Sequence, residues 1–245
     1  MSLAATFQIG ALAVSVLFAL LRLPLALKGR NPPLFWALVM LSAAIALGIT
    51  PVYLAVDSFF GGRNIANMFI RFAMFGFTFI IGVKSAVAFR APLAGRFIGG
   101  SVGVSLLLLV SALTVLFFFL ADMPESSPGL RDYGDQLPVI LYSFLGRAYP
   151  AYIAACLVVP ALSVATHRRR SKVIRAGAAF LGAGLGIAVL YAVQDLTPYD
   201  FSPWDHLLPY SAVITGTAGL ALLGSGRVAS NRQKKQTKLT QTFLR

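Results

Sequence analysis

Six polar residues lie in or beside strongly apolar stretches of the chain, where charged side chains are rare and costly. They are Arg147, Arg71, Asp57, Asp195, Asn67 and Tyr191. Two guanidinium groups and two carboxylates in one cavity could hold a small anionic or zwitterionic molecule, because guanidinium groups form paired hydrogen bonds with carboxylates and phosphates. The same charges could instead pair as Arg71–Asp57 and Arg147–Asp195 and lock helices together. Both interpretations stay open at the level of sequence.

Arg147 is the most informative of these residues. It follows Leu137 by ten positions, which is about 15 Å along a helix and about half the thickness of a bilayer core. An arginine at that depth marks a functional site or a buried partner. Pro150 comes three residues later and removes a backbone hydrogen bond, which predicts a kink beside Arg147.

Spacings of three and four residues align other polar side chains on helix faces. One face carries Asn64, Asn67 and Arg71, and an earlier one carries Tyr53 and Asp57. Tyr191 and Asp195 end a later stretch with the same spacing of four. These faces predict a polar cavity that opens toward the outside of the membrane.

Seven apolar stretches must position these side chains. The chain is 58% hydrophobic and only 12% charged, whereas soluble domains average about 25% charged residues. A bilayer core needs about 20 apolar residues per helix. The sequence therefore predicts an all-α fold, a polytopic membrane protein with one seven-transmembrane-helix bundle over residues 1–226 and a basic cytoplasmic tail over 227–245. The predicted spans are 7–27, 33–56, 64–89, 97–121, 137–166, 176–193 and 207–224.

The positions of the charges predict the orientation. All 8 acidic residues lie in or beside the second, fourth and sixth gaps between spans. All of the 21 Lys and Arg lie at the other gaps and in the tail except Arg63, Arg71, Arg131 and Arg147. The positive-inside rule then places the N-terminus outside and the C-terminus in the cytoplasm. We attribute the net charge of +13 to this rule and to anionic lipids at the cytoplasmic face, not to nucleic acid.

The chain lacks the sequence motifs of common catalytic sites. It has no GxSxG, HExxH or P-loop motif. His167 and His206 fall on opposite sides of the predicted bundle, and Cys156 is the only cysteine, so no metal site is expected. The last span has no lysine that could hold retinal as a Schiff base. We therefore expect no enzyme activity and no cofactor.

Small residues predict close helix packing in the sixth span. Gly182 and Gly186 form a GxxxG pair, with Ala178 one turn earlier. We expect this face to pack against another helix of the same chain, and a homo-oligomer is the alternative.

Three stretches carry a resemblance to a known group. They are TPVYLAVDSFFGGRNIANMFIR, the mid-span arginine followed by the basic run HRRRSKVIR, and VIRAGAAFLGAGLGIAVLYAV. The chain resembles actinobacterial seven-helix integral membrane proteins that are labelled as transporters or as proteins of unknown function. The resemblance implies a multi-pass protein of the bacterial plasma membrane and supplies no catalytic residues.

Two functions are compatible with these observations. The first is binding or transport of a small polar or anionic molecule through an outward-facing polar cavity. The alternative is a non-catalytic membrane component of a larger assembly or signalling complex, which docks a protein partner on its basic cytoplasmic face. The expected partners are the lipid bilayer, a small-molecule ligand, and a protein partner or a second copy of the chain.

Overall fold

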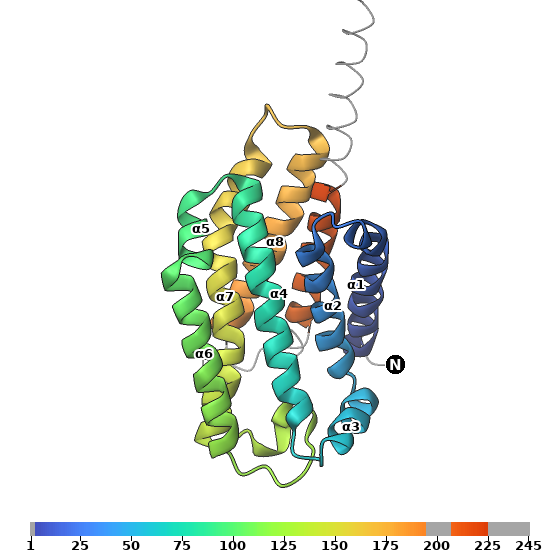
Figure 1. Cartoon of the computed structure of the whole chain (residues 1–245), viewed down its shortest axis with the longest axis vertical. Helices are drawn as coiled ribbons and strands as arrows, with labels where there is room; N and C mark the ends of the chain where they lie inside the picture. The colour runs from blue at the N-terminus through green and yellow to red at the C-terminus, as the bar shows by residue number, and fades with distance from the viewer. Residues whose placement is uncertain (1–2, 195–206, 225–245) are drawn as a thin grey trace, which may run out of the picture.

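The computed structural model describes residues 3–194 and 207–224, and these residues form helices joined by short connections (Figure 1). No strand occurs within those two ranges. A short 3-10 helix, η1 (Pro128–Tyr133), precedes α7, and one more helix covers Leu207–Gly224. The α-helices in chain order are α1 (Leu3–Leu27), α2 (Pro32–Leu47), α3 (Thr50–Phe59), α4 (Ile65–Phe89), α5 (Pro92–Gly99), α6 (Ser101–Leu120), α7 (Leu137–Thr166) and α8 (Lys172–Gln194).

Six helices in the described part of the chain are long and apolar enough to cross a membrane, with α5 and α6 counted as one. The bent pair of α2 and α3 passes the same test only when the two are taken together. Large apolar side chains point away from the bundle, among them Leu21, Leu108, Phe119 and Val159, which are each more than half exposed. Such surfaces suit the acyl chains of lipid, and they identify a multi-pass membrane protein.

The predicted span over 33–56 is broken into two helices. α2 ends at Leu47, α3 begins at Thr50, and the two helices are bent by 97°. Gly48 ends α2, and Pro51 lies in the first turn of α3, where the missing proline N–H is tolerated. α3 therefore turns across one end of the bundle (Figure 1) and brings Asp57 to the start of α4.

The fourth span also begins earlier than predicted. α5 starts at Pro92 rather than at residue 97, so Arg96 lies in a helix and not in a gap. The helix breaks at Gly100, whose backbone is extended, and α6 follows. A Cβ at Gly103 would lie 2.5 Å from the carbonyl carbon of Ile98, so only glycine permits this break. The other predicted boundaries agree with the helices to within a few residues.

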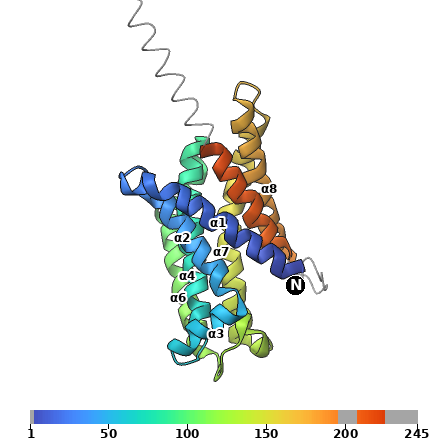
Figure 2. The same ribbon diagram turned by 90° about the vertical axis from the view of Figure 1, so that its right-hand side faces the viewer.

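The connections between helices gather at two ends that differ in charge (Figures 1 and 2). One end holds the α1–α2, α4–α5 and α7–α8 connections, and we call it the basic end. Its charged residues include Lys28, Arg30, Arg90 and 168–170. The opposite end holds the α3–α4 turn and the η1 loop, and we call it the acidic end. Its charged residues include Asp122, Glu125, Asp132 and Asp135.

The main core lies between α4, α5, α6 and α7. It contains Phe75, Ile98, Tyr149, Ile153 and Leu157, all of which are almost fully buried. The ring of Phe75 meets the ring of Tyr149 edge to face, with centroids 5.3 Å apart. This core fixes α4 beside α7, and these two helices carry the arginines of the candidate site.

α8 packs closely against the helix Leu207–Gly224 through glycines that differ from the predicted pair. A Cβ at Gly184 would lie 2.7 Å from the backbone nitrogen of Gly216, and one at Gly177 would lie 2.9 Å from that of Leu223. Gly186 instead has nothing within 4 Å, and Gly182 faces α7. The predicted face is therefore confirmed in part: Ala178 and Gly182 are buried and Gly182 packs against α7. Gly186 has no such neighbour, and the closest crossing uses Gly177 and Gly184 on the neighbouring face of α8.

Candidate functional site

A cavity of about 240 Å³ lies between α4, α7, α8 and the helix Leu207–Gly224. Each helix contributes residues spaced three or four apart, which is one face of a helix. Most of these side chains are apolar, so the predicted polar cavity is polar only in part. The lining residues used below are Arg71, Met74, Thr78 and Ile81 of α4, Gly146, Arg147, Pro150 and Leu157 of α7, Leu181, Ala188 and Tyr191 of α8, and Thr217 and Leu220 of the last helix.

The polar side chains of the cavity gather on the side of the acidic end. α4 and α7 both run away from the acidic end, and Arg71 and Arg147 lie in their first halves. α8 runs toward the acidic end, and Tyr191 lies in its last turn. Three predicted site residues, Arg71, Arg147 and Tyr191, therefore line one cavity although they come from three helices.

Arg71 is held by a tyrosine ring and by close packing. Its Cζ atom lies 5.2 Å from the ring centroid of Tyr142, which is a cation–π contact. Its guanidinium lies against the backbone of α7, since a Cβ at Gly146 would be 2.6 Å from Cζ. The buried Nε atom of Arg71 has no hydrogen-bond partner among the described residues.

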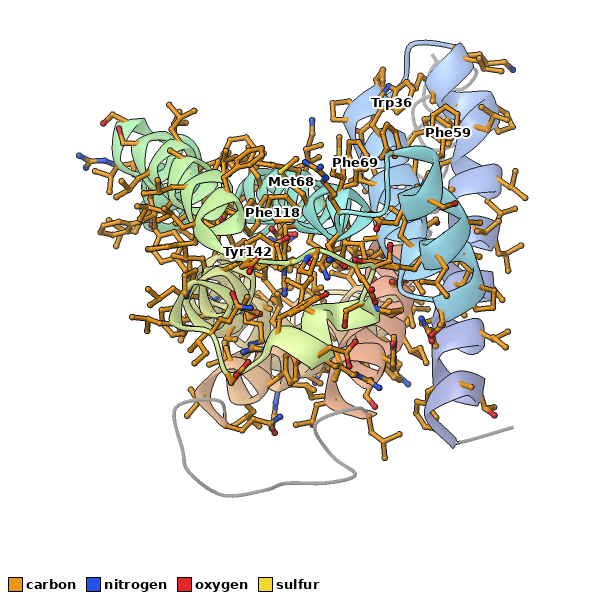
Figure 3. All side chains as sticks on the ribbon, turned by 90° about the horizontal axis from the view of Figure 1, so that it is seen from below. Trp36, Phe59, Met68, Phe69, Phe118 and Tyr142 are labelled. Atoms are coloured by element: carbon orange, nitrogen blue, oxygen red, sulfur yellow. The ribbon has the colours of Figure 1, made fainter. Side chains whose placement is uncertain are left out.

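Tyr142 links this arginine to Asn67. The Tyr142 hydroxyl donates to Oδ1 of Asn67 at 3.0 Å, and both side chains are almost fully buried. Seen from the acidic end in Figure 3, Tyr142 lies near the middle of the bundle, beside Phe118 and Met68. Asn67 therefore supports Arg71 from outside the cavity and does not line it.

Asp57 belongs to a separate polar region at the acidic end. Its carboxylate accepts hydrogen bonds from the backbone N–H groups of Asn64 at 2.9 Å and Ala66 at 3.0 Å. The hydroxyl of Ser126 also donates to it. A carboxylate at a helix N-terminus satisfies unpaired N–H groups and interacts favourably with the helix dipole. Asp57 is fully buried and does not line the cavity.

Asn64 completes this region, which we call the α3–α4 network. Its Oδ1 accepts from the Tyr53 hydroxyl at 2.8 Å and from the Ser127 N–H at 2.7 Å, and its amide donates to the Glu125 carbonyl at 2.7 Å. Asn64 adopts a left-handed conformation with φ 60°, which asparagine tolerates better than most residues. The network ties α3, α4 and the loop before η1 into one unit.

The structure thus separates the six predicted site residues. Asp57 and Asn67 lie outside the cavity, and Asp195 lies outside the described residues. The Arg71–Asp57 pair that the sequence left open is not formed, because the Asp57 carboxylate binds the N-terminus of α4. The Arg147–Asp195 pair falls on a residue that is not described.

Sequence reasoning missed Tyr142, Gly146 and the apolar lining of the cavity. Tyr142 and Gly146 lie on α7 at positions four apart, which follows the spacing of the polar faces, but neither residue is charged. The apolar lining has no signal of its own, because a cavity wall and a lipid-facing surface have the same composition.

No group of three or more His, Cys, Asp and Glu side chains in the described ranges could hold a metal ion. Two of the polar side chains of the cavity, Arg71 and Arg147, carry guanidinium groups, which only donate and are positively charged, so the site suits an anion. No protein-family model, curated protein or solved structure matches this chain.

Proposed function

We propose that this chain is a seven-span protein of the bacterial plasma membrane that binds a small anionic molecule in this cavity and moves it across the membrane. The observation that carries the proposal is the position of Arg71, which lines the cavity and has a buried nitrogen without a hydrogen-bond partner. A buried donor without a partner costs about 1–3 kcal/mol. An anion that accepted a hydrogen bond from this nitrogen would remove that cost.

Arg147 strengthens the preference for an anion. It lines the same cavity from α7 and so adds a second guanidinium group to it. Carboxylates and phosphates carry the charge that two guanidinium groups attract. Guanidinium groups also match these anions geometrically through two parallel hydrogen bonds.

The proposed orientation follows from the charges at the two ends. The basic end would face the cytoplasm and the acidic end the outside, with the N-terminus outside and α2 and α3 together forming the second span. The polar part of the cavity would then face outward. Asp135 and Ser171 are exposed at opposite ends and suit a labelling test.

That test uses Asp135→Cys and Ser171→Cys on a Cys156→Ser background. An impermeant thiol reagent added to intact cells should label the cysteine at 135 and leave the cysteine at 171 unlabelled until the cells are opened. The opposite pattern would reverse the orientation.

Anion binding is tested by thermal unfolding of the purified protein with phosphate or simple carboxylates. A ligand at a hundred times its Kd stabilises a protein by about 2.7 kcal/mol, which is roughly 5–10 °C in Tm for a chain of this size. Arg71→Gln should abolish this stabilisation. The matched control, Arg63→Gln, removes an exposed arginine at the same end and should not change it. If no acid raises the Tm, the proposal fails.

The exposed basic loop supports a second function, docking of a protein partner. Arg168, Arg169, Arg170 and Lys172 are all exposed between α7 and α8. Anionic lipid headgroups would also attract such a loop, so we favour anion binding. A cytoplasmic protein that co-purifies with the chain, and is lost when these residues become glutamine, would favour docking.

A further inference from the structure

We propose that the bound molecule is a single-chain amphiphile, with an acidic headgroup at Arg71 and Arg147 and an apolar tail along the rest of the cavity. This inference rests on the proposed function and narrows the class of ligand. The headgroup is a carboxylate or a phosphate, since the two share the geometry that guanidinium groups bind.

The distribution of lining residues supports a ligand with two different ends. On α4 the residues after Arg71 that line the cavity include Met74 and Ile81, and on α7 those after Arg147 include Pro150 and Leu157. From Arg71 to Ile81 the distance along the helix is about 15 Å. Both helices therefore change from charged to apolar in the same direction, away from the acidic end.

The deep part of the cavity offers little to a polar solute. Its hydroxyl groups among the described residues are those of Thr78 and Thr217. The Thr78 hydroxyl donates to the Met74 carbonyl of its own helix at 2.7 Å, so it is already used. A buried water needs two to four polar partners. A fully hydrophilic ligand would lose hydration in this part without replacement, whereas a hydrocarbon chain would not.

The volume limits the length of the tail. A water molecule has a share of about 30 Å³ in the liquid, so a cavity of 240 Å³ holds about eight groups of that size. With the carboxylate counted as one of these groups, an acid of about eight carbons in total fills the cavity. Each buried CH₂ should tighten binding about three- to fourfold, until the tail reaches the end of the cavity.

The experiment measures binding of radiolabelled octanoate to the full-length chain in nanodiscs of zwitterionic lipid, after subtraction of binding to empty nanodiscs. Competitors are acetate, butyrate, hexanoate, octyl phosphate, inorganic phosphate and octanol. We expect octyl phosphate to compete as well as octanoate. Affinity should rise with each CH₂ from acetate to octanoate, about a thousandfold in total. Octanol, which lacks the charge, should compete at least tenfold more weakly.

Two matched variants locate the tail. Ala188→Phe narrows the cavity one turn deeper than Tyr191 and should weaken octanoate binding at least tenfold while acetate changes less than threefold. Ala183→Phe makes the same change on the exposed face of α8 and should leave both affinities unchanged. Because the competitor series uses the unaltered chain, it tests the inference even if Ala188→Phe does not fold.

The outcomes separate this inference from the proposed function. If acetate or phosphate binds as tightly as octanoate, and each of these ligands requires Arg71, the anion site stands and the inference of an apolar tail is wrong. If octanol competes as well as octanoate, the ligand does not need an acidic headgroup and the cavity is only an apolar pocket. If octanoate binds equally well to the unaltered chain, to Arg71→Gln and to the control Arg63→Gln, the proposed anion site itself is wrong.

Discussion

Two polar regions near the start of α4 lie less than three turns apart. They differ in whether their polar groups have hydrogen-bond partners. In the α3–α4 network, the Asp57 carboxylate and the side chain of Asn64 are bonded to backbone groups and hydroxyls. At the cavity, Arg71 has a ring contact and a buried nitrogen without a partner among the described residues. Satisfied polar groups hold a structure together, whereas an unsatisfied group beside a cavity indicates a binding site.

The loop before η1 explains the difference. It brings Ser126 and Ser127 to Asp57 and Asn64, so that the network closes on itself. On the α7 side, the guanidinium of Arg71 occupies the space that a side chain at Gly146 would need, and Arg71 lines a cavity that no described side chain fills. One region is therefore filled by the chain itself, and the other leaves room for a ligand.

The largest expected effect is the loss of the α3–α4 network. Asp57→Asn should lower the free energy of unfolding by about 3 kcal/mol, because hydrogen bonds to a charged group contribute about 1.5–3 kcal/mol each and an amide cannot accept on both sides. In a chain of this size that is roughly 6–12 °C in Tm. The control Asp135→Asn changes an exposed carboxylate and should leave the Tm unchanged. Equal Tm values for the two variants would show that the network is not structural.

The wall of the cavity should be the next most sensitive feature. Gly184→Val places a branched side chain against the backbone of the last helix and should cost about 2 kcal/mol or more, as overpacking does. Gly186→Val makes the same change where nothing lies within 4 Å and should cost less than 1 kcal/mol. Thermal unfolding of both variants checks the order. A larger loss for Gly186→Val would mean that α8 makes its closest contact through Gly186 and not through Gly184.

Two tyrosines on α7 give the smallest expected effects. Tyr142→Phe removes a donor to Asn67 and should cost about 1 kcal/mol. Tyr149→Phe should cost nothing or stabilise slightly, because its buried hydroxyl has no partner within the described ranges. Both side chains are 1% exposed, so burial does not distinguish them. If the two variants lose the same stability, hydrogen bonding does not separate the two regions as we describe.

The helices could largely be predicted from the sequence, because apolar length and flanking charges are local signals. The span over 137–166 matches α7. The bend between α2 and α3 was missed although Gly48 and Pro51 mark it, since hydropathy continues through the break. Of the site, Arg71, Arg147 and Tyr191 were found because polar residues stand out in apolar stretches. The partner of Asp57 could not be predicted, because Ser126 is distant in the sequence and reaches it only through the fold.

The most direct test of the account is the stability of Arg71→Met without added ligand. Loss of the cation–π contact costs about 0.5–2 kcal/mol, and removal of the unsatisfied nitrogen returns about 1–3 kcal/mol. The account therefore predicts that the Tm falls by no more than roughly 4 °C, or rises, relative to the unaltered chain, together with the loss of stabilisation by octanoate. A fall in Tm as large as that of Asp57→Asn would contradict it, because Arg71 would then hold the fold together and would not be reserved for a ligand.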